Sequence, residues 1–148
     1  MTERIILTIV SIAMLILTIQ KKEKYSIILT CGLTLGIIIT WTRIPIIITS
    51  GILIYMITTL LITFYGIRKK ELLKSEKIII SITGIWPFIA KVFAFNHYPY
   101  TNEIRLSMII PLLLYLILIG KGIIKKKECG FMTILNVEFL LKFLRYWN

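Results

Sequence analysis

Apolar residues dominate five long stretches of the chain, and short polar clusters separate these stretches. They run from Ile5 to Gln20, Tyr25 to Trp41, Ile44 to Ile67, Ile78 to Phe95 and Ile104 to Ile124. A helix needs about 20 residues, at roughly 1.5 Å each, to cross the hydrocarbon core of a bilayer, and shorter stretches are tolerated. The pattern therefore predicts an all-α polytopic transmembrane helical bundle with five spans, in a single domain over residues 1–148.

Lysine clusters follow alternate stretches and predict the orientation of the spans. They lie at Lys21 to Lys24, at Arg68 to Lys77 and at Lys121 to Lys127. Basic residues concentrate in the cytoplasmic loops of membrane proteins. Five spans with the N-terminus outside and the C-terminus inside place every one of these clusters in the cytoplasm.

A sixth apolar stretch, from Phe131 to Trp147, has a different character. As a helix it carries Glu138, Lys142 and Arg145 on one narrow stripe, and apolar side chains cover most of the remaining surface. We favour an amphipathic interfacial helix on the cytoplasmic face, because that position keeps the charged stripe in water. The alternative is a sixth span, which would bury the three charges and place the C-terminus outside.

Composition narrows the class of protein further. The chain has 148 residues, of which 57% are hydrophobic, and its 18 basic against 7 acidic residues give a net charge of +11. Juxtamembrane lysines that face anionic headgroups explain this charge, so we expect the lipid bilayer as a partner and no nucleic acid.

Cys31 and Cys129 lie at no metal-ligand spacing and are interpreted as free thiols. We expect no metal and no cofactor.

Three features inside the spans could carry function. Lys91 lies in the fourth apolar stretch, where a charge is costly, although its long stem could carry the ammonium to the outer headgroups. The functional alternative for Lys91 is an ion pair with Glu103. Pro87 and Pro111 predict kinks, and a cavity between the kinked helices could be lined by Ser81, Thr83 and Ser107.

Gly32, Gly36 and Thr40 recur at every fourth residue of the second stretch. This spacing stacks small residues on one helix face and favours close helix packing or dimerisation.

The turn between the fourth and fifth stretches holds most of the remaining chemistry. The candidate polar site consists of Lys91, His97, Asn102, Glu103 and Arg105. His97 near Glu103 could form a general-base pair or respond to pH. A polar turn outside the membrane explains the same residues without chemistry, and we expect no catalytic residue.

The residues His97, Pro99, Asn102 and Glu103 form the pattern H-x-P-x-x-N-E between two spans. This pattern resembles the "FKxxHxPGANE" turn of small membrane proteins of Bacteroidota, including the transmembrane hairpin of the gliding-motility motor. Tyr100 and Thr101 replace its Gly-Ala, and Ala94 stands where that turn has lysine. The resemblance implies a bacterial source and hence the cytoplasmic (inner) membrane, and we expect no motor function to carry over.

Three classes of function remain open. We favour a small non-enzymatic membrane protein that acts through helix association with a membrane-protein partner or with itself, as an accessory subunit or an immunity or defence factor. The first alternative is an oligomeric transporter or channel subunit for a small solute or ion. The second alternative is a membrane enzyme that uses His97 and Glu103.

Overall fold

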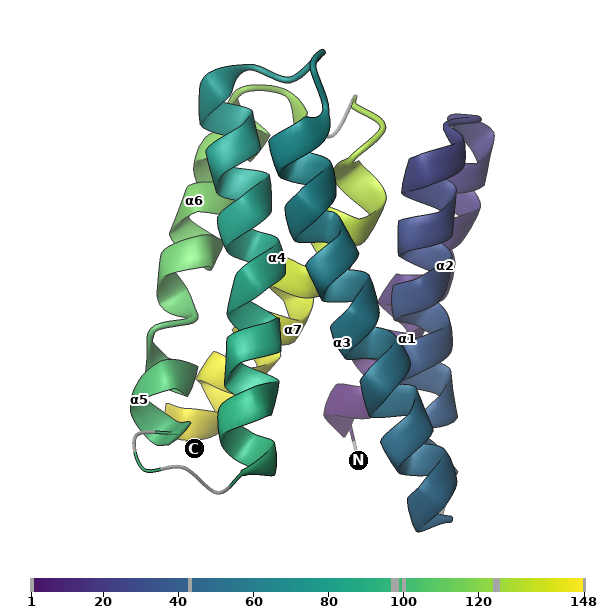
Figure 1. Ribbon diagram of the computed structural model, residues 1–148, viewed down its shortest axis with the longest axis vertical. Helices are drawn as coiled ribbons and strands as arrows, with labels where there is room; N and C mark the ends of the chain where they lie inside the picture. The colour runs from purple at the N-terminus through teal and green to yellow at the C-terminus, as the bar shows by residue number, and fades with distance from the viewer. Residues whose placement is uncertain (1, 43, 97–98, 100, 124–125, 148) are drawn as a thin grey trace.

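The computed structural model describes residues 2–42, 44–96, 99, 101–123 and 126–147, and only the backbone of 101, 102, 105, 146 and 147. These residues form an antiparallel helical bundle, which confirms the all-α prediction (Figure 1). The helices are α1 (Thr2–Gln20), α2 (Lys24–Ile39), α3 (Pro45–Arg68), α4 (Lys74–Phe95), α5 (Thr101–Leu106), α6 (Ile109–Gly120) and α7 (Cys129–Trp147).

The bundle has two chemically different ends. In Figure 1, α1 begins and α7 ends at the lower end, which we call the terminal end. The turns from α1 to α2, from α3 to α4 and from α6 to α7 lie at the upper end. This upper end holds the lysine clusters of the sequence, and we call it the lysine-rich end.

Local sequence explains where several helices begin. Glu23 precedes α2, and its carboxylate accepts a hydrogen bond from the backbone N–H of Ser26 at 2.6 Å, which satisfies a donor in the first helical turn. Pro45 is the first residue of α3, a position where its missing N–H costs no helical hydrogen bond.

The fifth apolar stretch is broken into two helices, α5 and α6, rather than forming one kinked span. Pro111 has no N–H to donate to the carbonyl of Ser107, and the N–H of Ile110 donates to that carbonyl at 3.0 Å instead. The Ser107 hydroxyl donates to the carbonyl of Ile104 at 2.7 Å and accepts from Nε1 of Trp86 at 3.1 Å. The proline therefore places the break between α5 and α6 just before itself, where the hydrogen bond from Trp86 of α4 stabilises it.

Pro87 lies inside α4, which continues across it. The kink expected there stays a prediction. The cavity expected between the kinked helices also stays a prediction. Two of its three polar hydroxyls bond to backbone: Ser81 donates to the carbonyl of Thr63 at 3.3 Å, and Ser107 donates to that of Ile104 at 2.7 Å.

Within the described residues, three helices are long and apolar enough to cross a membrane: α1, α3 and α4. The shorter apolar helices α2 and α6 have 16 and 12 residues, or roughly 24 and 18 Å at 1.5 Å per residue. Three of the five predicted spans therefore correspond to helices that are long enough to cross a bilayer by themselves, and five spans are not confirmed.

The helix at the C-terminus, α7, is a central member of the bundle. Its side chains at Phe131, Met132, Leu135 and Phe139 are fully buried, and α7 contacts α1, α2, α4 and α6. The expectation of an interfacial helix lying outside the bundle is wrong for this segment. The apolar surface that would have faced lipid packs against other helices. Of the charged stripe, Glu138 is buried and paired with Lys142, while Arg145 is exposed.

Helices α2 and α3 pack closely through Gly36 and Gly51. A Cβ atom on Gly36 would lie 3.1 Å from the carbonyl oxygen of Gly51 and 3.0 Å from Cβ of Tyr55. One turn earlier, a Cβ on Gly32 would lie 2.5 Å from Oγ1 of Thr58. The small-residue face of α2 is thus covered by α3 of the same chain.

Candidate functional site

A cavity of about 280 Å³ lies among α1, α2, α3, α4 and α7. Its described lining includes residues at the start of α1 and the end of α7, so it lies toward the terminal end of the bundle. The polar residues of this lining are Glu3, Arg4, Thr40, Trp41, Tyr55, Lys91, Glu138, Lys142 and Arg145.

Glu138 and Tyr55 form the most deeply buried polar contact of the cavity. The Tyr55 hydroxyl donates a hydrogen bond to Oε2 of Glu138, and Nζ of Lys142 lies 2.5 Å from Oε1 of the same carboxylate. The Glu138 side chain is only 8% exposed. A buried carboxylate is costly unless it is paired and hydrogen-bonded, and here both of its oxygens have partners.

Lys91 brings a second ammonium group to this contact from α4. Its Nζ lies 5.5 Å from the centre of the Tyr55 ring, within the range of a cation–π interaction. The charge of Lys91 also acts on Glu138. The ammonium group of the half-buried Lys91 therefore lies beside the Tyr55 ring, and its expected position at the outer headgroups stays a prediction.

The outer part of the cavity is lined by residues near the two ends of the chain. Nε of Arg145 lies 4.0 Å from Oε1 of Glu3, and both side chains are exposed. Nε1 of Trp41 donates to the Thr8 hydroxyl at 2.8 Å, which ties the end of α2 to α1. The described lining holds four basic and two acidic side chains, so its formal charge is positive.

Most of the polar site predicted around the outer turn lies outside the residues that the structure describes. His97 lies outside the described residues, as do the side chains of Asn102 and Arg105. Glu103 lies on α5 and is exposed. Lys91 is placed beside Tyr55 and Glu138, and its pairing with Glu103, like the role of His97, stays a prediction.

Sequence reasoning missed Tyr55 and Glu138. Tyr55 lies in the middle of an apolar stretch, where a buried hydroxyl needs a partner, and that was the available signal. Glu138 was assigned to a water-facing stripe together with Lys142. No local pattern indicates that this stripe faces α3, because the contact joins residues 83 positions apart.

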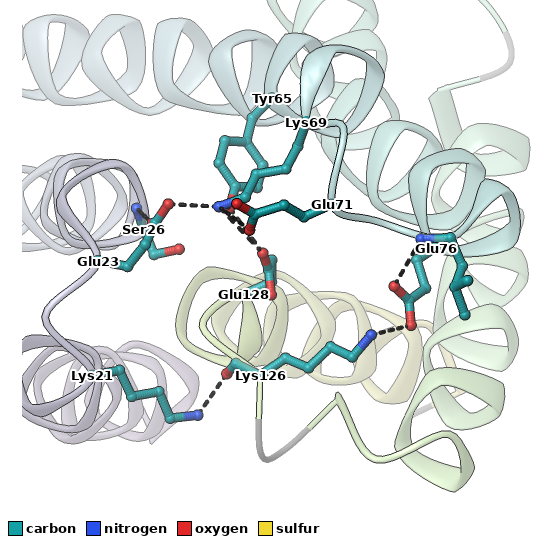
Figure 2. Close-up of polar contacts among 10 residues, drawn as sticks. Lys21, Glu23, Ser26, Tyr65, Lys69, Glu71, Glu76, Lys126 and Glu128 are labelled. Atoms are coloured by element: carbon teal, nitrogen blue, oxygen red, sulfur yellow. Dashed lines mark hydrogen bonds and ion pairs between the residues drawn. The ribbon is translucent and has the colours of Figure 1, made fainter.

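A second polar cluster closes the lysine-rich end, as Figure 2 shows. Nζ of Lys69 lies 2.6 Å from Oε1 of Glu23, and the Tyr65 hydroxyl donates to Glu128 at 2.9 Å. Through these contacts α3 is joined to the start of α2 and to the segment before α7.

The same cluster contains two contacts of Lys126. Its Nζ lies 2.5 Å from Oε1 of Glu76, and its carbonyl accepts a hydrogen bond from Nζ of Lys21 at 2.6 Å. The segment before α7 is thereby held to α1 and α4, which makes this cluster a structural clamp.

The charges of the clamp shift each other's titration. Burial alone would raise the pKa of Glu23, but hydrogen bonds from Lys69 and the N–H of Ser26 lower it overall. Burial alone would lower the pKa of Lys69, but its hydrogen bonds with Glu23 and Tyr65 raise it well above the ordinary value. Both groups are therefore charged around neutral pH.

The described residues contain no group of three His, Cys, Asp or Glu side chains that could hold a metal ion. Cys31 is half-buried and Cys129 is buried, and both are free thiols. The charged cavity is therefore the strongest candidate site in the part of the chain that the structure describes.

Comparisons with protein-family models, with curated proteins and with solved structures find no match for this chain. Its function is therefore inferred from the cavity and the bundle alone.

Proposed function

We propose that this protein is an integral protein of a bacterial inner membrane that binds a small anion in the charged cavity, as a subunit of a transporter. The observation that carries the proposal is the buried contact of Glu138 with Tyr55 and Lys142, with Lys91 beside it. Ionisable groups inside a membrane bundle are costly, and they commonly mark the pathways of substrates or ions.

The proposal includes six membrane crossings in place of five. The exposed surface of the bundle is rich in Ile, Leu and Phe, as a lipid-facing surface would be. With α7 as the sixth crossing, the lysine-rich end faces the cytoplasm, in agreement with the positive-inside rule, and both chain ends lie outside. The cavity then opens toward the outside.

The size and the charge of the cavity favour a small anionic solute. Its volume of about 280 Å³ is slightly below that of a typical pocket for a drug-sized ligand. The excess of basic side chains in its described lining attracts negative charge. A small carboxylate, phosphate or chloride fits both properties.

Close packing on the side of the cavity toward the lysine-rich end favours a transporter over an open channel. Beyond Glu138, toward the lysine-rich end, α7 carries the fully buried side chains of Phe131, Ile134 and Leu135. A cavity that is open to one side and closed by packed side chains on the other corresponds to one state of an alternating-access cycle.

Helix association, the function favoured from the sequence, loses one of its supports. The face formed by Gly32 and Gly36 packs on α3 of the same chain and is not available to a partner. The enzyme hypothesis rests on His97, which lies outside the described residues, and it stays a prediction.

Anion binding is tested on the protein purified in mild detergent. The probes are sodium chloride, phosphate, acetate and succinate at constant ionic strength, and the readout is the melting temperature. We expect at least one probe to raise the melting temperature of the wild type, and the same probe to accumulate in reconstituted vesicles.

Three variants make this test specific. Lys91→Met removes one cation of the cavity and should abolish the effect of the probe, while Lys91→Arg keeps the charge and should retain it. Lys74→Met removes an exposed lysine from the other end of α4 and should behave as the wild type. The proposal fails if no probe acts on the wild type, or if Lys91→Met responds equally.

A further inference from the structure

A second hollow, separate from the charged cavity, lies on the outer surface between α2 and α3. In Figure 1 these two helices lie close together at the terminal end and diverge toward the lysine-rich end. The groove between them has a volume of about 550 Å³. Its described lining is Tyr25, Ile28, Leu29, Leu61, Phe64, Tyr65, Arg68 and Lys69.

The walls of this groove are apolar and open to the surroundings of the bundle. Ile28 is 61% exposed, Phe64 is 55% exposed and Leu61 is 48% exposed. Such side chains in a groove at the edge of a membrane bundle suit an acyl chain, because hydrocarbon fills the space between the two helices without cost to polar groups.

The end of the groove at the lysine-rich end is basic. Arg68 is exposed and makes no ion pair within the described residues, whereas the neighbouring Lys69 is held by Glu23. Tyr25, 69% exposed, adds a hydroxyl to the same lining. A guanidinium and a hydroxyl at headgroup depth are suited to bind a phosphate.

We propose that this groove binds an anionic phospholipid of the cytoplasmic leaflet, with one acyl chain between α2 and α3 and the headgroup phosphate on Arg68. The proposal rests on the membrane embedding described above, but it does not depend on anion binding in the cavity. A zwitterionic lipid such as phosphatidylethanolamine also carries a phosphate, but its own ammonium group competes with Arg68 for that charge. A soluble phosphate would leave the apolar walls uncovered. Charge complementarity together with these walls therefore selects an anionic lipid.

The test measures which lipid stays with the protein. The full chain is reconstituted in vesicles of equal parts phosphatidylglycerol and phosphatidylethanolamine, washed with carbonate, extracted in mild detergent and analysed by native mass spectrometry. We expect phosphatidylglycerol to be retained in preference. Arg68→Gln should reduce this preference about fivefold, the effect of one basic group near an anionic membrane surface.

Two further variants separate the groove from general surface charge. Lys70→Gln removes an exposed lysine two residues away that does not line the groove, and it should leave the preference unchanged. Ile28→Trp keeps the charge but fills the groove, and it should reduce retention of phosphatidylglycerol.

Equal retention of the two lipids by the wild type would overturn the proposal, as would an equal loss in Lys70→Gln and Arg68→Gln. Release of the protein by the carbonate wash would instead refute membrane embedding, so the two failures are distinguishable.

Discussion

At the scale of single residues, two buried or half-buried carboxylates of this protein are each bound by more than one partner. Glu138 is bound by both Tyr55 and Lys142, and Glu23 is bound by both Lys69 and the backbone of Ser26. Removal of one partner from a buried or half-buried pair leaves the other charge without compensation. The resulting loss of folding stability is larger than the loss caused by breaking an exposed ion pair.

The ion pair of Glu23 and Lys69 predicts how stability depends on pH. The pKa of Glu23 is lowered from its ordinary 4.5, so its contribution is complete above that pH and is lost as the pH falls through the lowered value. The pKa of Lys69 is raised from 10.5, so its contribution is complete below that pH and is lost as the pH rises through the raised value.

Lys69→Met should therefore destabilise the protein by about 2 kcal/mol at neutral pH, the range for a hydrogen bond between charged groups. The measurement is the unfolding free energy in detergent at neutral pH and at about pH 3, below the ordinary pKa of glutamate. The difference from wild type should shrink at the acidic pH, because the stabilising contribution of Glu23 declines as the pH falls below its ordinary pKa and through the lowered one. A difference of equal size at both values would contradict the pairing, and Lys70→Met is the control.

At the scale of elements, helix contacts decide what the local pattern leaves open. The fifth apolar stretch contains enough residues for one span, yet Pro111 divides it and the break is held by Trp86 of α4. Helix α7 has the amphipathic pattern of a surface helix, yet it becomes a core helix because α1, α2, α4 and α6 cover its apolar side.

The contact of α2 with α3 gives a prediction at this scale. Gly36→Ala should lower the unfolding free energy by roughly 1–3 kcal/mol, because the added methyl meets the carbonyl of Gly51 and Cβ of Tyr55, which cannot move aside without separating the helices. The measurement is thermal or denaturant unfolding in detergent.

Gly120→Ala is the matched control for this variant. Apart from its chain neighbours and the backbone of its own helix, no atom lies within 4 Å of the added methyl. Alanine is favoured over glycine in a helix by up to about 1 kcal/mol. We expect unchanged or slightly increased stability. If both variants behave alike, close packing of α2 on α3 is not the cause of the effect.

At the scale of the whole molecule, the direction of α7 fixes where the chain ends. An interfacial helix would keep the C-terminus in the cytoplasm, while a sixth crossing brings it to the same end of the bundle as the start of α1. The two arrangements place Lys142 and Arg145 on opposite sides of the membrane, and the positive-inside rule alone would favour the first. Burial of α7 favours the second.

Reporter fusions distinguish these arrangements. Alkaline phosphatase fused after Asn148 or after Asn102 should be active, because both positions are outside in the six-span arrangement, and a fusion after Lys74 should be inactive. A fluorescent protein fused after Asn148 should be dark when it is exported through the general secretory route. Fluorescence there together with an inactive phosphatase would return the C-terminus to the cytoplasm and refute the sixth crossing.

The sequence predicted the helical class and most helix positions, because hydrophobic stretches and lysine clusters are local features. The first four apolar stretches each correspond to one helix, from α1 to α4. The candidate site was predicted less well. Lys91 was identified, but its partners Tyr55 and Glu138 lie on α3 and α7, and no periodicity within one helix indicates which neighbour a side chain will meet.

The sequence by itself determined that apolar helices alternate with basic turns, since the free energy of burying or exposing each segment depends on its own composition. Only the tertiary structure decided that α7 enters the bundle and that Glu138 of its charged stripe faces Tyr55 rather than water. The physical reason is that a charged side chain can be satisfied either by water or by a partner inside the protein. Which of the two applies depends on residues far away in the chain.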